Sequence, residues 1–379
     1  MTIPFFAPDL FESDRQVLLD LVHEIGTAPA QKFLLGEHTA RFEDALRTSL
    51  GAADVVACSS GTSALTLVLH AMGVGPGDEV VVPAYGCAPL ANSVVGLGAT
   101  PVFADIDPWT MVADPDRVEQ AITARTRAIM PAHMFSVMAG MPRMREIARQ
   151  HGVRLVEDSA VAQGGVLDGR PAGTWGEAGV FSFVQVKTFG TAGEGGAVIT
   201  MDPELGQAVR SLRNHGQGER FVYRRTGYNS RFDEVLAAFQ LHRLPGFPAL
   251  LERRARIADY YTERFAPLRE QGVLAPPAGR NGRCYYVYSL LADDRDALQR
   301  YLAARGIESH VYYPQPLPHQ AAFARFAPAG RSWPHAASAA RRQLAIPVHP
   351  CLTDAQVEHI AAAVRAYAGA RENTKERSR

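Results

Sequence analysis

Short β-rich runs alternate with longer helical patterns through the first two thirds of this chain. The β-rich runs are Asp54–Cys58, Glu79–Val82, Thr100–Ala104, Ala128–Pro131, Arg154–Glu157 and Gly179–Phe183. The helical candidates between them are Ser63–Met72, Leu90–Leu97, Pro115–Ile122 and Met144–Gln150. Strands that alternate with helices form βαβ units, so the alternation predicts an α/β fold with a mostly parallel sheet covered on both faces.

The pattern changes after about residue 245. The predicted elements there are a long amphipathic helix at Leu250–Phe265, a strand at Cys284–Leu291, a helix near Arg295–Arg305, a strand near Glu308–Tyr312 and a last helix near Asp354–Tyr367. We therefore expect a large domain over residues 1–245 and a smaller α+β domain over 246–370. The charged segment 371–379 lacks apolar anchors and is expected to be a disordered tail.

Composition excludes several classes of function. The 39 basic and 39 acidic residues cancel, whereas proteins whose main task is binding nucleic acid usually carry a basic excess. The four cysteines have no CxxC spacing and the twelve histidines no metal-binding spacing, so we predict neither a disulfide framework nor a metal site. The first residues do not resemble a secretory signal, and no apolar run reaches the roughly 20 residues that span a bilayer. A cytoplasmic protein is expected.

Three segments are candidates for chemistry. In the first, a β-run ends at Ser60-Gly61-Thr62 and a helix follows at once. The N–H groups of a helix N-terminus, a glycine and two hydroxyls suit phosphate. Taken alone, the segment fits an ordinary capped helix better. The second candidate is Asp158, at the carboxyl end of a buried strand, where α/β sheets place their ligands. A helix cap or an ion pair explains Asp158 equally well.

The third and strongest candidate is Lys187. It lies between two β-like runs and is followed by a loop of glycines and small residues, TFGTAGEGG. A lysine beside such a loop is suited to forming a Schiff base, provided that desolvation or neighbouring cations lower its pKa from about 10.4. An isolated lysine is usually a solvated surface charge, but this flanking sequence argues against that interpretation.

Together these motifs resemble a known family. The ordered blocks SSGTSAL, GVGPGDEVVVPAY, GATPVFADIDP, VEDSAVAQG, FSFVQVK, GEGGAV, LRNHGQ and GYNSRFDEVLAAFQ resemble the DegT/DnrJ/EryC1/StrS family from about Phe33 to about Thr353. These are pyridoxal-phosphate (PLP) enzymes of the aspartate-aminotransferase fold, fold type I, often called sugar aminotransferases. The resemblance implies an aminotransferase that moves an amino group from glutamate or glutamine to the ketone of a nucleotide-linked sugar.

The resemblance also implies roles for individual residues. Lys187 would bind the cofactor covalently, and Asp158 would hold its pyridine nitrogen protonated. Glu194 and Gly195 belong to the loop behind the lysine. The cofactor phosphate would be bound by Gly61, Thr62 and Ser182, together with Asn229 of a neighbouring subunit. The active site would then be shared across a homodimer interface.

The chain departs from the family pattern at the cofactor. Cys87 stands where an aromatic ring commonly stacks on the cofactor, and a thiol cannot supply that stack. Val161 replaces a glutamine that contacts the ring hydroxyl, and Gln163 replaces a histidine two residues further on. The block that usually reads HYP is Tyr312-Tyr313-Pro314. These changes leave the substrate class open.

Other residues and functions stay open as well. His215, Arg231 and Tyr313 are candidates for substrate contact, although Arg231 and Arg213 are equally explained as structural arginines. Dehydratases of the family carry histidine in place of the lysine, and Lys187 argues against that activity. A cyclitol ketone as the acceptor, an enzyme that makes an aromatic amino acid, and a PLP-binding regulatory subunit with little turnover remain alternatives.

Overall fold

The computed structural model describes residues 2–7 and 14–377. Its helices are α1 (Arg15–Thr27), α2 (Glu37–Leu50), α3 (Gly61–Ala71), α4 (Pro89–Val95), α5 (Pro115–Ala121), α6 (Met141–His151), α7 (Pro203–Arg213), α8 (Glu234–Arg243), α9 (Phe247–Phe265), α10 (Arg295–Ala303), α11 (Pro334–Arg342) and α12 (Asp354–Arg377). Its strands are β1 (Asp54–Cys58), β2 (Glu79–Pro83), β3 (Thr100–Ala104), β4 (Thr126–Ile129), β5 (Arg154–Asp158), β6 (Val166–Leu167), β7 (Arg170–Pro171), β8 (Ala178–Ser182), β9 (Gly196–Thr200), β10 (Gln217–Glu219), β11 (Val222–Tyr223), β12 (Val273–Leu274), β13 (Tyr288–Ala292) and β14 (Gln343–Ile346).

A seven-stranded sheet forms the centre of the molecule, in the order β1-β9-β8-β5-β4-β2-β3. Neighbours from β8 to β3 pair in parallel, and β9 runs antiparallel to both β1 and β8. Every residue of β2, β8 and β9 is buried, as expected for sheet strands covered on both faces. The predicted α/β class with a mostly parallel sheet is confirmed.

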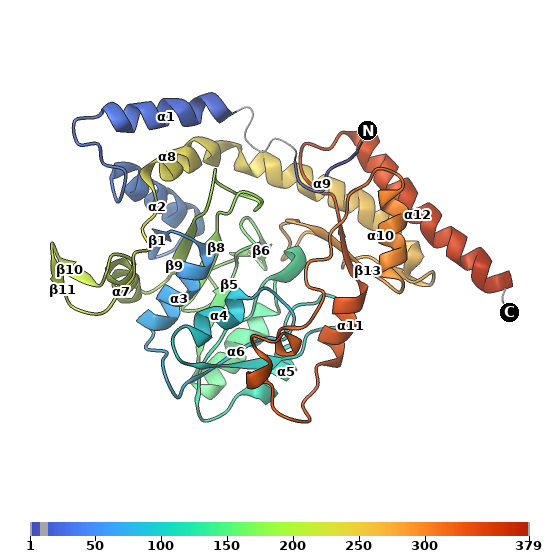
Figure 1. Ribbon diagram of the computed structural model, residues 1–379, viewed down its shortest axis with the longest axis horizontal. Helices are drawn as coiled ribbons and strands as arrows, with labels where there is room; N and C mark the ends of the chain where they lie inside the picture. Colours follow the sequence, from blue (N-terminus) through green and yellow to red (C-terminus); the bar gives the residue numbers. More distant parts are fainter. Residues whose placement is uncertain (1, 8–13, 378–379) are drawn as a thin grey trace.

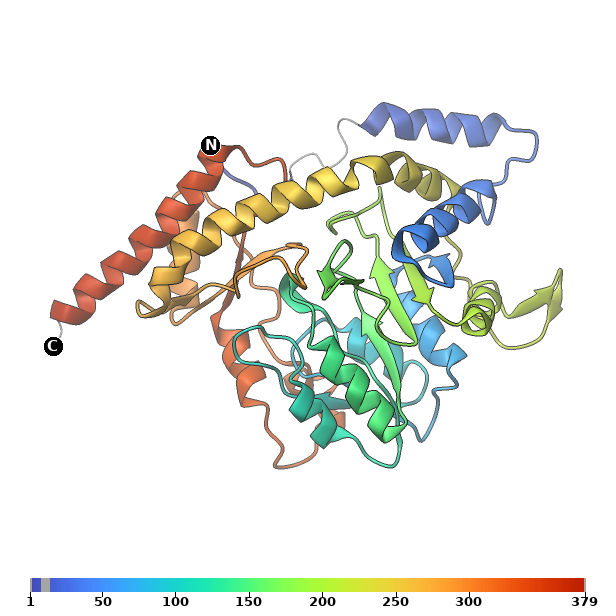
Figure 2. The ribbon, with the colours of Figure 1, turned by 180° about the vertical axis from the view of Figure 1, so that it is seen from behind.

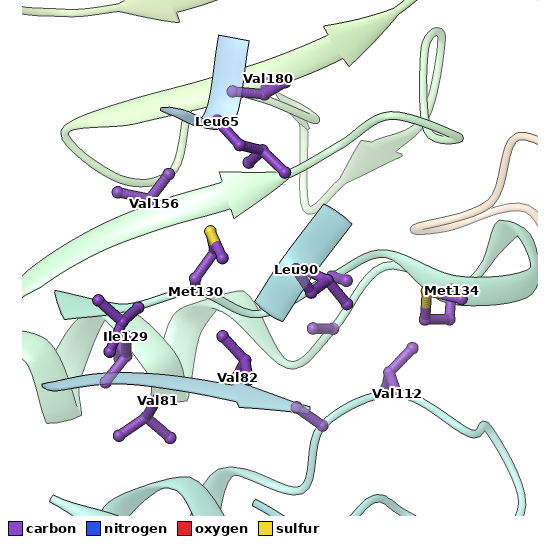
Figure 3. Close-up of a cluster of buried hydrophobic side chains, with 14 of the residues drawn as sticks. Leu65, Val81, Val82, Leu90, Val112, Ile129, Met130, Met134, Val156 and Val180 are labelled. Atoms are coloured by element: carbon purple, nitrogen blue, oxygen red, sulfur yellow. The ribbon is translucent and has the colours of Figure 1, made fainter. Parts of the chain in front are cut away.

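Apolar side chains fill the space between this sheet and its helices (Figure 3). Leu65 of α3 and Leu90 of α4 lie among the sheet residues Val82, Val156 and Val180, and all five are buried. Burying one such side chain contributes roughly 1.5–3 kcal/mol. This packing fixes α3, whose first residues belong to the candidate phosphate site.

The strand register places candidate residues from separate motifs side by side. Cys58 at the end of β1 and Ser182 at the end of β8 both pair with Gly196 of β9. Asp158, at the end of β5, pairs with Val180 in the same sheet. Since β1, β5 and β8 run in the same direction, these ends meet at one edge of the sheet.

A second core lies around α9, α10, α12 and the three-stranded sheet β12-β13-β14. In Figures 1 and 2 the long helix α9 runs from above the large sheet to this second core. Tyr261 and Phe265, in the C-terminal half of α9, belong to the second core. Phe247, the first residue of α9, packs on Phe189, which follows β8 of the large sheet.

Two predictions for the C-terminal part need correction. The segment predicted as a strand near Glu308–Tyr312 forms only single bridges, at Ile307 and His310. The ladder stops after His310 because the Tyr312 N–H donates to the Gln343 side chain at 3.0 Å instead of to the backbone of β14. The last helix is longer than predicted and reaches Arg377, inside the predicted tail. Residues 378–379 of that tail lie outside the described residues.

The β10–β11 hairpin projects from the side of the molecule (Figure 1). Its side chains are exposed although several are apolar, and Phe221 at its turn is 70% exposed. None of the described helices combines the length and the hydropathy needed to cross a membrane.

Candidate active site

The N-terminus of α3 lies directly beside the end of β8. Ser60 caps this helix, because its hydroxyl accepts a hydrogen bond from the Ser63 N–H at 3.1 Å. A Cβ atom on Gly61 would lie 2.8 Å from Ser182 Cβ, so only glycine allows this approach. The N–H groups of the first helical turn, with the hydroxyls of Thr62 and Ser182, can hold a phosphate group.

Asp158 is a buried carboxylate at the same edge of the sheet. Its Oδ1 accepts a hydrogen bond from the Ala160 N–H at 3.0 Å. Burial raises the pKa of Asp158, while the Ala160 N–H and the charge of Lys187 act in the opposite direction. A cationic partner, such as a protonated ring nitrogen, would stabilise the ionised carboxylate. Asp158 therefore suits a cofactor whose protonated ring nitrogen would pair with this carboxylate.

The neighbouring Glu157 has a different environment. Its carboxylate accepts hydrogen bonds from His133 Nε2 at 3.1 Å and from the N–H groups of Gly173, Trp175 and Gly176. His133 Nδ1 in turn accepts from the Ala139 N–H at 3.1 Å, so Nε2 carries the proton. Glu157 is thus fully engaged in holding the backbone, which leaves Asp158 as the acid available to a ligand.

Lys187 lies in a turn that hydrogen bonds hold against the end of β8. The Lys187 N–H donates to Val184 O at 2.9 Å. Gln163, which is buried, donates from Nε2 to Ser182 O at 2.6 Å and accepts at Oε1 from Thr188 Oγ1 at 3.1 Å. Gln163 therefore links the end of β8 to the residue directly after the lysine.

The C-terminal part of the chain contributes aromatic side chains near Lys187. Lys187 Nζ lies 4.7 Å from the ring centroid of Tyr286, a cation–π contact. The Tyr312 hydroxyl donates to the Tyr286 hydroxyl at 3.4 Å. Tyr313 packs against Tyr312 with ring centroids 6.0 Å apart; burial raises the pKa of Tyr313, and the Asp158 carboxylate acts in the same direction. The lysine therefore lies between the end of β8 and aromatic residues from the C-terminal part of the chain.

Cys87 and Val161 also lie beside this site. Burial raises the pKa of the Cys87 thiol to about 12; Asp158 acts in the same direction and Lys187 opposes it. The thiol is therefore neutral near pH 7. The Val161 carbonyl accepts a hydrogen bond from Cys284 Sγ at 2.8 Å, which joins the position to the small domain. The aromatic residue closest to Cys87 in sequence is Tyr85. Its ring packs edge-on against the ring of Tyr313, with 5.6 Å between the ring centroids.

Other predicted residues lie apart from Lys187 in this chain. Asn229 and His215 are exposed, on neighbouring backbone joined by a hydrogen bond from the His215 N–H to Tyr228 O at 2.8 Å. Arg231 lines a separate cavity of about 620 Å³ beside Glu194. The structure does not bring these residues to the lysine.

Arg213 is a structural arginine. It is buried, pairs with Glu43 at 2.5 Å and donates to the Ala57 carbonyl oxygen at 2.5 Å. Of the two interpretations left open for this residue, anion binding and an internal ion pair, the geometry supports the ion pair.

Two residues at the site were not recognised from the sequence. His133 follows the predicted strand at Ala128–Pro131, so its place after a parallel strand was a usable signal. Tyr286 belongs to the run CYYVY, nearly 100 residues from Lys187 in sequence, and no local pattern links the two. Only tertiary packing brings the two residues together.

Comparisons with known proteins agree with this geometry. The chain is 38% identical over 333 residues to a UDP-N-acetyl-3-dehydro-alpha-D-glucosamine 3-aminotransferase of Acidithiobacillus ferrooxidans, covering 88% of this chain and 89% of the relative. It is 37% identical over 337 residues to a dTDP-3-amino-3,4,6-trideoxy-alpha-D-glucose transaminase of Streptomyces venezuelae, covering 89% of each protein. The crystal structure of S. venezuelae DesV in complex with a ketimine intermediate superposes with a TM-score of 0.92 and 35% identity, over 97% of this chain and 98% of that one.

A family model covers almost the whole chain. The model of the DegT/DnrJ/EryC1/StrS aminotransferase family matches residues 20–365, and this range includes every candidate residue described above. Pyridoxal phosphate is the cofactor of this family. The match, the high identity and the superposition lead to one conclusion: the chain belongs to the DegT/DnrJ/EryC1/StrS aminotransferase family.

Proposed function

We propose that this aminotransferase transfers an amino group from glutamate or glutamine to the ketone of a nucleotide-linked keto-sugar. The observation that carries the proposal is that a buried carboxylate, Asp158 at the end of β5, and a half-buried lysine, Lys187 in the turn after β8, lie near one another although they come from different motifs, close enough for the lysine charge to act on the carboxyl group. The names of the two relatives, a UDP-sugar and a dTDP-sugar aminotransferase, support the class of acceptor. Because their nucleotides differ, the base and the sugar stay open.

In this proposal each residue has one task. Gly61, Thr62 and Ser182 bind the phosphate of the cofactor. Asp158 keeps a proton on the ring nitrogen, and pyridoxal phosphate when bound supplies an electron sink. Lys187 moves a proton at the substrate carbon, which is general acid–base work by a group already in place.

The proposal also includes a homodimer with shared active sites, in which Asn229 reaches the phosphate held by the partner. Asn229 and His215 are exposed side chains on a hydrogen-bonded backbone, and near them the hairpin exposes Phe221 and Tyr223. Exposed apolar side chains gathered in one region are typical of protein interfaces. These features favour a second copy over a monomer.

Absorbance spectroscopy tests the reaction in two halves. The protein loaded with cofactor is mixed with L-glutamate or L-glutamine, and the spectral change is followed together with release of the keto acid. UDP-linked and dTDP-linked keto-sugars are then added, and recovery of the first spectrum identifies the acceptor. A spectrum that responds to no amino donor would favour the alternative of a binding or regulatory protein.

A further inference from the structure

A buried guanidinium lies at the boundary between the two domains. Arg254 of α9 is 7% exposed, and its Nη1 donates to the carbonyl oxygens of Tyr286 at 3.2 Å and Tyr285 at 3.4 Å. In the part of the chain that the structure describes, its Nε has no hydrogen-bond partner and no carboxylate pairs with it. A buried charge without a counter-ion destabilises a protein, so a fold that keeps one needs a reason.

Arg254 lines a cavity of about 380 Å³ that also contains Lys187. A second buried polar group faces the same cavity. His349, 6% exposed, donates from Nε2 to Pro4 O at 3.2 Å, and its Nδ1 has no partner among the described residues. Two incompletely bonded side chains from different elements therefore meet at one cavity beside the reactive lysine.

The orientation of the guanidinium limits what it can bind. Since Nη1 is engaged by the two carbonyls, Nε and Nη2 remain, and these two donors form the side-on edge that matches both oxygens of a carboxylate. Arg254 holds the backbone of Tyr286, and the ring of that same residue lies under Lys187 Nζ. A carboxylate bound to Arg254 would thus be connected to Lys187 through a single residue, Tyr286.

We propose that this cavity binds a carboxylate of the amino donor, with Arg254 as the receptor. The proposal rests on the function above and adds how the donor is recognised. Asp14 lines the same cavity, but Arg243 holds it at 3.3 Å, so it does not neutralise Arg254. The volume suits a small dicarboxylic amino acid or its amide better than a nucleotide-linked sugar. Before the donor's amino group reacts, its carboxylate would already be fixed.

Isothermal titration of the full-length protein, with cofactor bound, tests the proposal without turnover. The probe is glutarate, which has the two carboxylates of glutamate and no amino group to react. We expect glutarate to bind to the wild type and the neutral glutaramide not to bind. Arg254→Met should weaken glutarate binding by at least tenfold, and Arg254→Lys, which keeps the charge but loses the two-donor edge, should weaken it less. The matched control Arg256→Met removes an exposed arginine of the same helix and should bind as the wild type does.

Stability measurements separate a receptor from a structural arginine. If Arg254 only holds the two carbonyls, Arg254→Met lowers the melting temperature and leaves the affinity for glutarate unchanged, which overturns the proposal. If Arg254 is a receptor, the ligand-free variant loses little stability, because an uncompensated charge has been removed. Should Arg254→Met fail to fold, unchanged glutarate affinity in Arg254→Lys has the same consequence. Tighter binding of UDP than of glutarate, lost in Arg254→Met, would assign the site to the nucleotide and also overturn the proposal.

The half-reactions distinguish this proposal from the proposed function. An Arg254→Met protein that converts glutamate with wild-type concentration dependence, while the wild type aminates a keto-sugar, disproves the receptor and leaves the function intact. Glutarate binding that depends on Arg254, in a wild type that aminates no keto-sugar, supports the receptor and disproves the acceptor.

Discussion

The residues around Lys187 and the residues around Asn229 differ in what holds them. Lys187 lies among groups of its own chain, with Tyr286 against its Nζ and Gln163 fixing the turn on which it stands. Asn229 has a backbone that its own chain orders, but its side chain is exposed. The surroundings of Lys187, the first region, therefore come from its own chain, whereas the exposed side chain of Asn229, in the second region, is free to contact another molecule, as the proposed dimer requires.

The difference separates two ways in which a substitution can reduce activity. A change in the first region removes chemistry and leaves assembly intact. A change in the second region acts through assembly and through loss of cofactor. The predictions below use this distinction, beginning with the largest expected effect.

Lys187→Ala should abolish transamination while the protein stays folded and keeps its assembly state. The chain has only three lysines, Lys32, Lys187 and Lys375, so the test is unambiguous. Borohydride reduction of the cofactor-loaded protein followed by peptide mapping should label Lys187, and Lys32→Ala serves as the control. A label on either other lysine would disprove the assignment.

Asp158→Asn should lower kcat by orders of magnitude and leave the melting temperature unchanged or higher. The rate should fall because each unit by which the pKa of the ring nitrogen decreases corresponds to about 1.4 kcal/mol. Stability should not fall, because burial already disfavours the ionised carboxylate of Asp158. Glu157→Gln is the contrasting variant. It should destabilise the protein, because backbone N–H groups then meet a neutral acceptor. Near-wild-type turnover of Asp158→Asn would remove the residue from its proposed role.

Asn229→Ala should lower cofactor retention most strongly on dilution. Light scattering across a dilution series, with cofactor occupancy recorded at each point, should show cofactor lost together with the dimer. Asn92→Ala, an exposed asparagine on α4, provides the control. A wild-type monomer with full occupancy would contradict the shared site and move Asn229 out of the cofactor region.

Gln163→Leu should have the smallest effect of the four. It removes the link between Ser182 and Thr188, and leaving buried polar groups without partners costs about 1–3 kcal/mol. We expect faster amide hydrogen exchange in residues 184–195 and a decrease of about tenfold in kcat at nearly constant KM. Exposed Gln150→Leu is the control. Unchanged exchange in this segment would show that the turn is held by other contacts.

The sequence predicted most of the large domain because its signals are local. Asp54–Cys58 and Thr100–Ala104 are strands with the predicted bounds, since β-branched runs between turn residues define such strands by themselves. The small domain was less predictable. No local pattern predicts the strand β14 (Gln343–Ile346), because it is held by pairing with β13, more than 50 residues earlier in the sequence.

The same limit applies to the site. Asp158 ends a strand and Ser60-Gly61-Thr62 and Lys187 follow strands, and parallel strands bring such positions to one edge. Neither Tyr286 at Lys187 nor Arg254 in the neighbouring cavity could be found in this way, since both positions depend on tertiary packing of the C-terminal part of the chain. The contrast between Glu157 and Asp158 was also hidden, because three N–H donors to Glu157 come from a distant loop.

The helix α9 has a mechanical consequence. At one end Phe247 packs on Phe189, two residues after the lysine, with ring centroids 4.7 Å apart; at the other end Tyr261 and Phe265 are buried in the second core. A single helix therefore joins the second core to the turn that bears Lys187. Substitutions that loosen either end of α9 are thus expected to reach the lysine although they lie far from it in sequence.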